Sequence, residues 1–357
     1  METTEVVESQ SISNAHTTVG RKPVTLGMRL AGVAWAVMDL YAVGVIGFLL
    51  VRLVVRESWW LIAMLDNALQ WALLPSFAFT AVAVWRKRMR RFVLYGSVAL
   101  VFVFTYIELF LPRLPVQTAC PADNPTCVTH LRVMQVNLFN NQFEADKMIP
   151  VLRNSGADII AAEEFSAGPA AIIKQELSDV YPYQVQFGDY IPGIGLLSKY
   201  PITSAETLIF SENQFLPHIL ATLDVDGYPL RVIVAHPPPP RVDREGIFPV
   251  YQPYGSYDIK RLMELIDPDV PTLMPGDFNI TDQSDDYRVI HDAGLRDAFR
   301  EAGWGFGVTW PVGFAIPPLV RIDYIWMTQH FEASAAWVGE KNASDHFPVY
   351  ADLVWRH

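Results

Sequence analysis

The sequence is poor in cysteine, and its two cysteines stand close together. Cys120 and Cys127 flank "PADNPT", a spacing that matches no common zinc-binding pattern. A short disulfide loop in an oxidising compartment is our interpretation of the pair, and two free thiols are the alternative. Internal repeats and low-complexity segments are also lacking, so neither a repeat array nor a compositionally biased protein is indicated.

An excess of positive charge is lacking as well. The chain holds 27 Lys and Arg against 38 Asp and Glu, and most of the deficit lies in residues 113–357, with 17 basic against 31 acidic residues. A region this acidic has no general electrostatic attraction for nucleic acid phosphates. A polyanionic substrate would therefore need a local basic patch or a metal ion.

Long apolar runs are abundant, but only near the N-terminus. The segments 30–51, 59–85 and 92–111 are each long enough to cross a hydrocarbon core of about 30 Å, and they predict three transmembrane helices. A cleaved signal peptide is the alternative for the first run, although it is long for that role and two more runs follow. Buried helices of a soluble protein are the other alternative.

Basic residues near these runs predict the orientation of the chain in the membrane. "RKRMRR" (86–91) lies between the second and third runs, whereas the loop between the first two offers only Arg52 and Arg56. The N-terminal tail and the second loop are therefore expected in the cytoplasm, and everything after the third run outside it. We expect a disordered tail over 1–24, a transmembrane region over 25–111, a Pro-rich linker over 112–130 and one folded domain over 131–357.

Short apolar runs alternate with amphipathic stretches in the last of these regions. Strands are predicted at 131–139, 157–165, 183–187, 194–198, 204–210, 218–225, 228–236, 271–278, 320–327 and 346–355. Helices are predicted at 144–156, 169–177, 257–266 and 284–293. This mixture predicts a layered α/β domain.

Polar groups capable of chemistry stand at the ends of five predicted strands. They are Asn137, Glu164, His236, Asp277 with Asn279, and the adjacent pair Asp345 and His346. Ligand sites of layered α/β folds tend to lie at such sheet edges, so we expect these side chains to share one site.

Each motif alone also has an ordinary structural interpretation. "GDFN" is consistent with an Asx turn, Glu164 with a solvated strand end, and His236, before "PPPP", with a half-exposed loop residue. Asp323 in "RIDYIW" either orients a neighbouring imidazole or pairs with Arg321. The interpretation as a site depends on the whole set.

Taken in order, these stretches resemble the endonuclease/exonuclease/phosphatase superfamily of metal-dependent phosphohydrolases, in its membrane-anchored bacterial form. The matching segments are "VNLF", "DIIAAEEF", "GIGLLSKYPI", "VIVAHP", "GDFN", "RIDYIW" and "SDHFPV", and they cover about residues 131–355. The resemblance implies a four-layer α/β/β/α sandwich of the DNase I type, here after three transmembrane helices. It also implies one Mg²⁺ or Mn²⁺ ion and hydrolysis of a phosphate ester by in-line attack of water.

The resemblance implies a role for each residue. Glu164 looks like the principal metal ligand, with Asn137 and Asp345 near the ion. Asp277 would hold or deprotonate the attacking water, and Asn279 would bind the phosphate. His346, oriented by Asp323, and His236 would stabilise negative charge during the reaction. Many nucleases of the superfamily carry an acid where this chain has Phe139, which argues against a second metal ion there.

The expected substrate is a phosphodiester outside the cytoplasm: a lipid head group, a nucleotide, a nucleic acid fragment or an envelope phosphodiester. The bilayer is the other expected partner, and no protein partner is indicated. A phosphomonoesterase of the same superfamily is one alternative. A non-catalytic membrane sensor or scaffold is another, and Asp39, Asp66 and Glu108 within the apolar runs favour it slightly.

Overall fold

The computed structural model describes residues 25–113, 116, 128–139, 143–188, 192–210, 216–245 and 248–356. The predicted disordered tail over 1–24 and the cysteine pair lie outside these residues. Most of the predicted linker lies outside them too, although the first strand begins at Val128, inside its predicted range.

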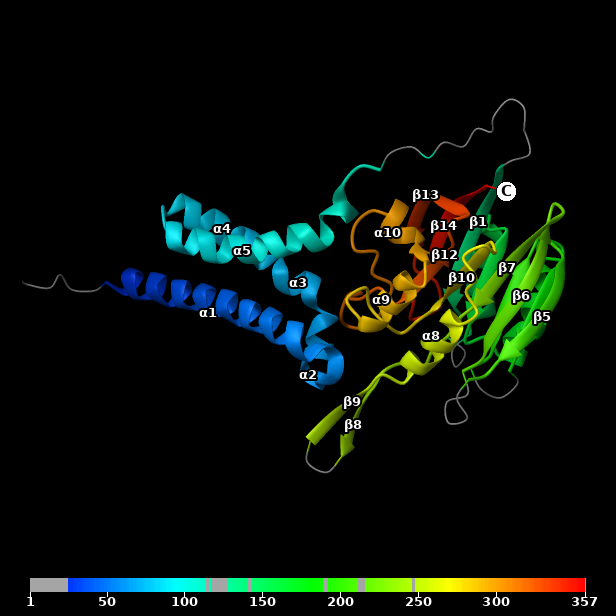
Figure 1. Cartoon of the computed structure of the whole chain (residues 1–357), viewed down its shortest axis with the longest axis horizontal. Helices are drawn as coiled ribbons and strands as arrows, with labels where there is room; N and C mark the ends of the chain where they lie inside the picture. Colours follow the sequence, from blue (N-terminus) through cyan, green and yellow to red (C-terminus); the bar gives the residue numbers. More distant parts are fainter. Residues whose placement is uncertain are drawn as a thin grey trace, which may run out of the picture.

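The apolar N-terminal region forms helices that extend away from the rest of the chain (Figure 1). They are α1 (Leu26–Val55), η1 (Arg56–Ser58), α2 (Trp60–Asp66), α3 (Leu69–Leu73), α4 (Pro75–Trp85), α5 (Met89–Tyr106) and η2 (Ile107–Phe110). Two helical stretches, Leu26–Ser58 and Met89–Phe110, are long and apolar enough to cross a membrane. The second predicted run is broken after Asp66, with a bend of 74° between its two parts, and it makes a third span only if these parts are counted together.

Six strands form the first sheet of the α/β domain, in the order β13-β14-β1-β2-β4-β3. Their bounds are β1 (Val128–Asn137), β2 (Ile159–Glu163), β3 (Tyr183–Phe187), β4 (Ile194–Ser198), β13 (Phe331–Val338) and β14 (Val349–Arg356). Strand β1 runs parallel to β2 and antiparallel to β14. The carboxyl ends of β1 and β2 and the beginning of β14 therefore share one edge.

A second six-stranded sheet has the order β11-β12-β10-β7-β6-β5. Its strands are β5 (Ile202–Leu208), β6 (His218–Val225), β7 (Tyr228–Val234), β10 (Thr272–Asp277), β11 (Arg296–Asp297) and β12 (Asp323–Met327). A separate hairpin, β8 (Arg241–Glu245) and β9 (Phe248–Gln252), projects beside α2 (Figure 1). Strand β10 is parallel to β7 and antiparallel to β12, which repeats the arrangement of the first sheet.

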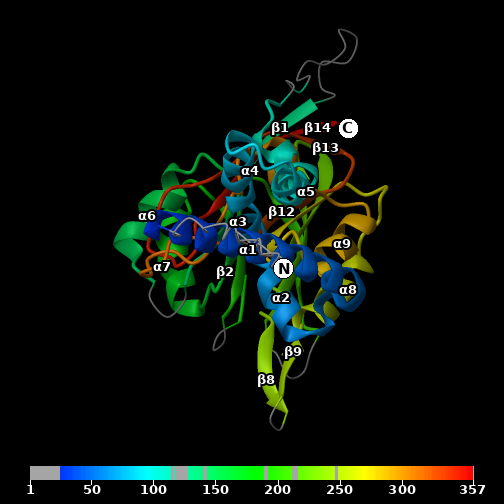
Figure 2. The ribbon, with the colours of Figure 1, turned by 90° about the vertical axis from the view of Figure 1, so that its left-hand side faces the viewer.

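The two sheets pack face to face between two helical layers. Figure 2 shows α6 (Ala145–Asn154) and α7 (Ala167–Leu177) on one side, and α8 (Gly255–Met263) and α9 (Asp285–Asp292) on the other. Consecutive strand residues face different layers: Val133 lies in the core between the sheets, whereas Met134 packs under α6 and α7. Burial on both faces explains why these strands are apolar runs without polar alternation. The predicted four-layer α/β/β/α fold is confirmed.

Five elements that the structure describes in the α/β domain were not predicted from the sequence: β8, β9, β11, β13 and α10. The β8–β9 hairpin contains Pro249, and proline within a run argues against a strand unless the strand lies at an edge. Strand β13 contains four alanine or serine residues, which have weak strand preference, and α10 (Ala298–Ala302) is only five residues long.

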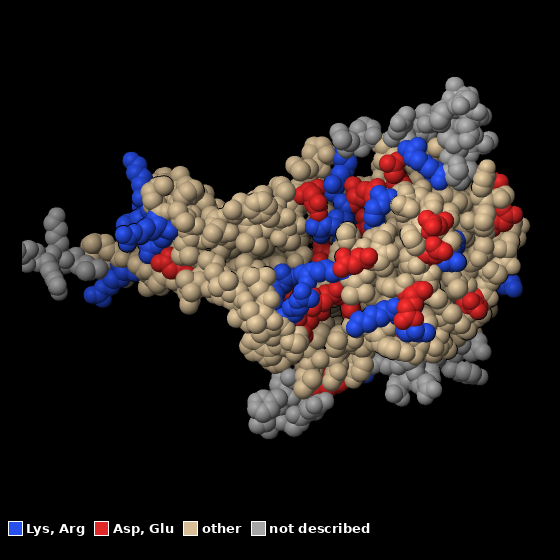
Figure 3. All heavy atoms as spheres, viewed as in Figure 1, with Lys and Arg blue, Asp and Glu red and all other residues tan. Residues whose placement is uncertain are grey.

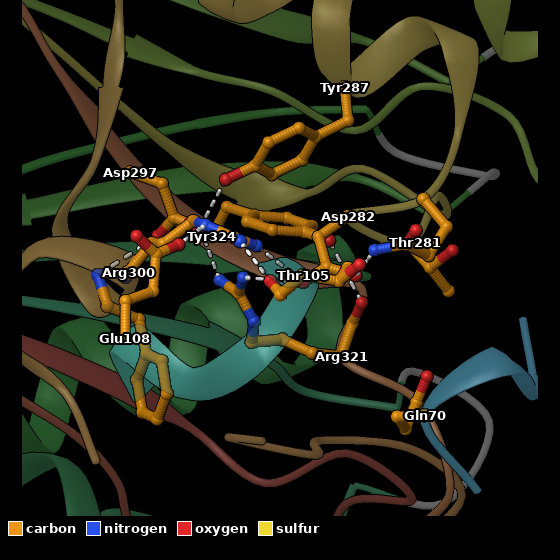
Figure 4. Close-up of polar contacts among 12 residues, drawn as sticks. Gln70, Thr105, Glu108, Thr281, Asp282, Tyr287, Asp297, Arg300, Arg321 and Tyr324 are labelled. Carbon is orange, nitrogen blue, oxygen red and sulfur yellow. Dashed lines mark hydrogen bonds and ion pairs between the residues drawn. The ribbon is translucent and has the colours of Figure 1, made fainter. Parts of the chain in front are cut away.

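The helical region is fixed to the α/β domain by a polar network, which Figure 4 shows in close-up. Arg300, on α10, donates to the Thr105 carbonyl at 2.8 Å and to Asp282 at 3.0 Å, and it pairs with Glu108. Beside it, Arg321 donates to Asp297 at 2.6 Å, and both side chains are buried. Glu108 is thus anchored to the α/β domain rather than isolated in the membrane.

An aromatic contact accompanies this network. The ring of Phe306 lies 5.2 Å from Trp71, 5.7 Å from Tyr106 and 5.3 Å from Phe110, and the Gly305 amide donates to the Leu109 carbonyl at 2.7 Å. An apolar ring from the α/β domain is therefore embedded among the helices. Together with the ion pairs, this contact holds the two regions in one arrangement.

The other two acids of the apolar runs are also paired. Asp39 accepts hydrogen bonds from Arg91 and from the Tyr95 hydroxyl, and Asp66 pairs with Arg52 at 2.6 Å. Pairing is the ordinary structural interpretation of acids in such segments. Asp39, Asp66 and Glu108 therefore do not support the sensor hypothesis.

Candidate active site at the edge of the two sheets

The candidate site lies where the carboxyl ends of β1, β2, β7 and β10 meet. The chain reaches it because β10 approaches β7 very closely: a Cβ atom at Gly276 would lie 2.0 Å from the carbonyl oxygen of Ala235. Only glycine permits that approach, which places His236 beside Asp277. Asp323 opens β12 directly opposite Asp277, because these two strands are antiparallel.

An imidazole between two carboxylates forms the centre of the site. His346 Nδ1 is 3.0 Å from Asp323 Oδ2, and His346 Nε2 is 3.8 Å from Asp277 Oδ2. All three side chains are buried. Asp323 therefore holds the imidazole with its Nε2 directed at Asp277, at a distance longer than a direct hydrogen bond.

Asp323 thus adopts the first of its two predicted roles. Its expected alternative partner, Arg321, instead pairs with Asp297. The predicted strand over 320–327 begins only at Asp323, so Arg321 precedes the strand and its side chain is free to turn to another partner.

The Asp345–His346 pair also differs from its predicted place at a strand end. It precedes β14, which begins at Val349. Because β14 runs antiparallel to β1, its beginning lies beside the end of β1. The pair therefore joins the same edge from the opposite chain direction.

Asn137 and Glu164 form the second part of the site. Asn137 Nδ2 donates to Glu164 Oε1 at 3.3 Å and to Asp277 Oδ2 at 3.2 Å, while its Oδ1 accepts from the amide of Phe139 at 2.9 Å. Asn137 therefore connects the carboxylate at the end of β2 with the one at the end of β10, across the two sheets.

His236 and Asn279 form the third part. His236 Nε2 is 4.0 Å from Asp277 Oδ2, so two imidazoles flank the same carboxylate oxygen. The Asn279 amide donates to Asp277 Oδ1 at 3.0 Å, which is the predicted Asx turn, and its side chain donates to the Pro237 carbonyl. The Asx turn is thus part of the site, because the turn fixes the Asp277 carboxylate.

Three residues of the site region have left-handed backbone conformations without being glycine. Phe139, Glu164 and Asn279 have φ values of 50°, 51° and 56°. Each follows the end of a central strand, and such a conformation costs about 1–2 kcal/mol in residues other than glycine. Strained backbone of this kind concentrates at functional sites, where surrounding contacts hold it.

Burial and neighbouring charges give the central groups of the site different pKa values. Burial, together with the Asp323 charge, raises the pKa of Asp277 to about 7. Burial alone would lower the pKa of His346, but Asp323, Asp277 and Asp345 raise it to about 10. Burial lowers the pKa of His236 to about 3. Near neutral pH the site therefore holds one imidazolium, one neutral imidazole and a carboxyl group close to its titration point.

The donor set also fits a hard divalent cation. Asp277, Asp323 and His346 place ligand atoms within 4.8 Å of one another, but the hydrogen bond from His346 to Asp323 already engages this group. Glu164 and Asp345 both line the adjacent cavity, and Asp345 Oδ1 is buried without a hydrogen-bond partner. Carboxylate and amide oxygens are what Mg²⁺ and Mn²⁺ prefer, so Glu164 and Asp345 are the better candidates for ligands. Asn137 can join them only through its Oδ1, which also accepts from the Phe139 amide.

Four further residues support the site and were not predicted from the sequence. Gln135 donates to Glu163 at 2.7 Å and to Asp323 at 2.8 Å. Gln135 precedes Asn137 by two residues, so the alternation of side chains along a strand could have identified it. Burial raises the pKa of Glu163 well above its ordinary value.

The other two support the His236 loop. His218 Nδ1 accepts from the backbone amide of His236 at 3.0 Å, and its Nε2 lies 3.2 Å from Asp258. Asp258 comes from α8, far from His218 in the sequence. No local sequence pattern joins the two, so only the fold identifies this pair.

The predicted site residues lie around one cavity of about 400 Å³. Glu164, Asp277, Asn279, Asp345 and His346 line it directly. Asn137, His236 and Asp323 contact these residues from behind, through the hydrogen bonds and ion pairs described above. The structure therefore brings all eight candidates together.

Comparison with known proteins agrees with this geometry. The model of the Endonuclease/Exonuclease/phosphatase family matches residues 134–346. No curated protein sequence matches the chain.

Several solved structures share the fold. An endonuclease/exonuclease/phosphatase from Beutenbergia cavernae is 20% identical, with 64% of this chain and 72% of that chain covered and a TM-score of 0.50. The corresponding protein from Bacteroides vulgatus is 18% identical, with 63% and 98% covered and a TM-score of 0.50. A humanized D. rerio TDP2 is 15% identical, with 63% and 98% covered and a TM-score of 0.51. At such identities the likeness establishes the fold alone.

Proposed function

Because the chain belongs to the endonuclease/exonuclease/phosphatase family, a family of hydrolases that act on phosphoester bonds, we propose that it is a membrane-anchored, divalent-metal-dependent phosphodiesterase. The observation that supports this most is the Asp323–His346–Asp277 array at the edge of a cavity that Glu164 and Asp345 also line. A phosphate bound in this cavity would meet a base, Asp277, and an imidazolium, His346. It would also lie beside the carboxylates proposed to hold the ion.

In the proposed mechanism, Asp277 accepts a proton from the water that attacks phosphorus. Its raised pKa, about 7, gives it useful basicity at neutral pH. Asn137 and the Asn279 amide hold the carboxylate in place by donating to its two oxygens. A carboxylate fixed in this way can align water for in-line attack.

His346 and His236 face the negative charge that develops on the phosphoryl oxygens. His346 carries a proton over most of the physiological range and donates from Nε2, because Asp323 occupies its Nδ1. His236 is neutral and offers one N–H group. Fixed donors of this kind in a buried site stabilise the transition state more than the ground state.

Glu164, Asp345 and Asn137 would hold the cation, which we propose to be Mg²⁺ or Mn²⁺. When bound, such an ion neutralises phosphate charge and polarises the phosphorus–oxygen bond. It would also offset the acidity of the site, whose carboxylates alone would repel an anionic substrate.

A direct test compares single substitutions in the full chain, purified in detergent, on bis(4-nitrophenyl) phosphate with Mn²⁺. Asp277→Asn and His346→Gln are each expected to lower kcat/KM by about 10³-fold, and EDTA to abolish turnover until Mn²⁺ is restored. The exposed residues Asp269 and His291 supply matched controls, Asp269→Asn and His291→Gln, which should retain activity.

Three results would contradict the proposal: no turnover by the parent chain, equal rates in the parent and in the two site variants, or activity that survives EDTA. A parallel assay with 4-nitrophenyl phosphate distinguishes a phosphomonoesterase, which would prefer that monoester.

A further inference from the structure

The wall of the active-site cavity is completed by the membrane-associated helical region. Glu57, in η1, and Asn67, between α2 and α3, line the same cavity as Asp277 and His346. Residues far apart in the sequence therefore enclose one space, and part of the enclosure comes from segments that are apolar enough to lie in a membrane.

Specific contacts fix this part of the wall. Ser284 donates to Glu57 at 3.3 Å, and Thr281 donates to the side-chain oxygen of Asn67 at 3.1 Å. Arg52 donates to the Gln283 carbonyl at 3.2 Å. Residues 281–284, which follow the Asn279 turn, are thus held against the ends of α1 and α2.

The break after α2 has a physical explanation in this position. The backbone is irregular at Asn67 and Ala68, where the helix bends by 74°. Irregular backbone at membrane depth is tolerated where it is buried in protein or lines a polar cavity, because its amide groups must be satisfied. Asn67 meets that condition by lining the active-site cavity.

Exposed apolar side chains lie beside the cavity-lining residues on three separate elements. Trp59 and Met64, at the start of α2 and within it, are 44% and 53% exposed and flank the segment from Glu57 to Asn67. Phe314 and Ile316, in the loop between the cavity-lining residues Trp310 and Val320, are 60% and 53% exposed. Val242, on β8, is exposed opposite Tyr251, which also lines the cavity.

The apolar loop lies against the helices. Gln70 and Trp71 both donate to the Leu319 carbonyl, at 3.0 and 2.8 Å. Leu319, at the end of this loop, is therefore held against α3. Figure 3 shows that the surface of the helical region is almost free of charge between the basic cluster at its far end and the charged band at the domain. Exposed tryptophan and phenylalanine in this position are typical of the membrane–water interface.

Charge around the cavity argues against a polymeric substrate. Among the described residues that line it, none is lysine or arginine, and Glu57 and Glu164 are acidic. Proteins that bind nucleic acid neutralise several phosphates with basic side chains along an open groove. Here Glu57 and Asn67 of the helical region form part of the cavity wall, which an open groove for a polymer would lack.

We propose that the substrate is a glycerophospholipid of the surrounding bilayer, which enters between α2 and the loop 311–319 with its phosphodiester beside His346. This inference rests on the proposed function. The oxygen of water bonds to phosphorus, one phosphorus–oxygen ester bond breaks, Asp277 takes the water proton, and the leaving oxygen gains a proton. The products are one alcohol and one phosphate monoester.

The experiment uses the full chain with Mn²⁺ on two substrates, and a DNA oligonucleotide is assayed beside them for comparison. One is soluble bis(4-nitrophenyl) phosphate. The other is vesicles of phosphatidylethanolamine, phosphatidylglycerol, phosphatidylcholine and cardiolipin, with the released alcohols and phosphate monoesters identified by mass spectrometry. We expect hydrolysis of at least one vesicle lipid. In mixed micelles its rate should follow the surface fraction of lipid rather than its bulk concentration.

Variants of the exposed apolar residues beside the cavity, here called rim variants, distinguish an effect on lipid access from an effect on hydrolysis itself. The double variant Phe314→Ser with Ile316→Ser, outside the catalytic machinery, should lower lipid hydrolysis about tenfold and leave the soluble substrate unaffected. The matched control, Ile209→Ser, changes an equally exposed residue next to β5, at the other edge of the second sheet from β11. It should change neither rate.

The outcomes distinguish the two proposals. If neither substrate is hydrolysed, the proposed function itself is wrong. If the soluble diester is hydrolysed but no vesicle lipid is, or if a DNA oligonucleotide is cleaved faster than every lipid, the lipid inference is overturned. Equal loss of both activities in the rim variant, or equal loss of lipid hydrolysis in Ile209→Ser, also counts against it.

Discussion

At the scale of single residues, the site depends on an acid and an imidazole, Asp277 and His346, whose side chains lie 3.8 Å apart. Asp277 has a pKa raised to about 7 by burial and by Asp323, and His346 has one raised to about 10 despite its burial. Each stabilises the charged form of the other, so around neutral pH a carboxylate and an imidazolium coexist in a buried space. An acid and a base are thus available together.

These pKa values predict a bell-shaped dependence of kcat/KM on pH. Asp277 accepts a proton only when it is ionised, so activity should rise with pH toward about 7; a bound cation moves this limb to lower pH. His346 stabilises charge only while protonated, so activity should fall as pH passes about 10. Steady-state rates on bis(4-nitrophenyl) phosphate between pH 5 and 11 measure both limbs.

The variant Asp323→Asn tests whether His346 causes the alkaline limb of the pH profile of kcat/KM. Asp323 is the charge that raises the pKa of His346 most, so its loss should move that limb to lower pH and reduce the maximal rate. An alkaline limb that stays in place in this variant would show that His346 is not the group responsible.

At the scale of elements, β11, α10 and the start of β12 connect the candidate active site to the apolar N-terminal helices. Asp297 accepts from Arg321 at 2.6 Å, from the Tyr287 hydroxyl at 3.0 Å, and from the Phe299 amide at the start of α10. One buried carboxylate thus fixes a helix start, a buried cation and a tyrosine. The same helix carries Arg300, which reaches α5 and η2.

Asp297→Ala is therefore expected to be strongly destabilising. It leaves the buried Arg321 charge without its nearest partner, and breaking a buried ion pair costs about 3–5 kcal/mol. For a domain of this size the midpoint of thermal unfolding in detergent should fall by about 10 °C. Asp292→Ala, at an exposed position on α9, is the control and should change the midpoint little. Equal midpoints for the two variants would contradict the role given to Asp297.

The bounds of three predicted strands agree with the structure residue for residue, although one of these strands, β3, is only half-buried at the edge of its sheet. The predicted strands at 183–187, 194–198 and 218–225 coincide with β3, β4 and β6. The second apolar run was predicted as one helix, but it is broken after Asp66. Hydropathy reports the composition of a segment, whereas this break depends on contacts of Asn67 and Gln70 with residues more than 200 positions later.

At the scale of the whole molecule, the charge pattern supports one placement in a membrane. Figure 3 shows basic side chains at the far end of the helices and a mixed charged band at the α/β domain, with an apolar surface between them. Five of the basic residues belong to the segment 86–91. An apolar surface bounded by charge at both ends is what a bilayer requires, and we propose that the positive end faces the cytoplasm.

A reporter enzyme fused after the C-terminus tests this orientation. We expect alkaline phosphatase, which requires an oxidising compartment, to be active there, and a cytoplasm-dependent fluorescent protein to be dark. Replacing the basic residues of 86–91 with neutral ones should weaken the preference. A fluorescent fusion with inactive phosphatase would place the α/β domain in the cytoplasm instead.

The sequence by itself determined the apolar N-terminal region, the layered α/β class and the eight candidate residues, because each of these follows from local patterns of hydropathy or from short motifs. Only the tertiary structure decided how those residues combine. It showed that Asp323 serves His346 rather than Arg321, that Gln135 and Glu163 support the centre, and that Glu57 and Asn67 complete the cavity. Such contacts join positions far apart in the chain, and only the packing of sheets and helices brings them together.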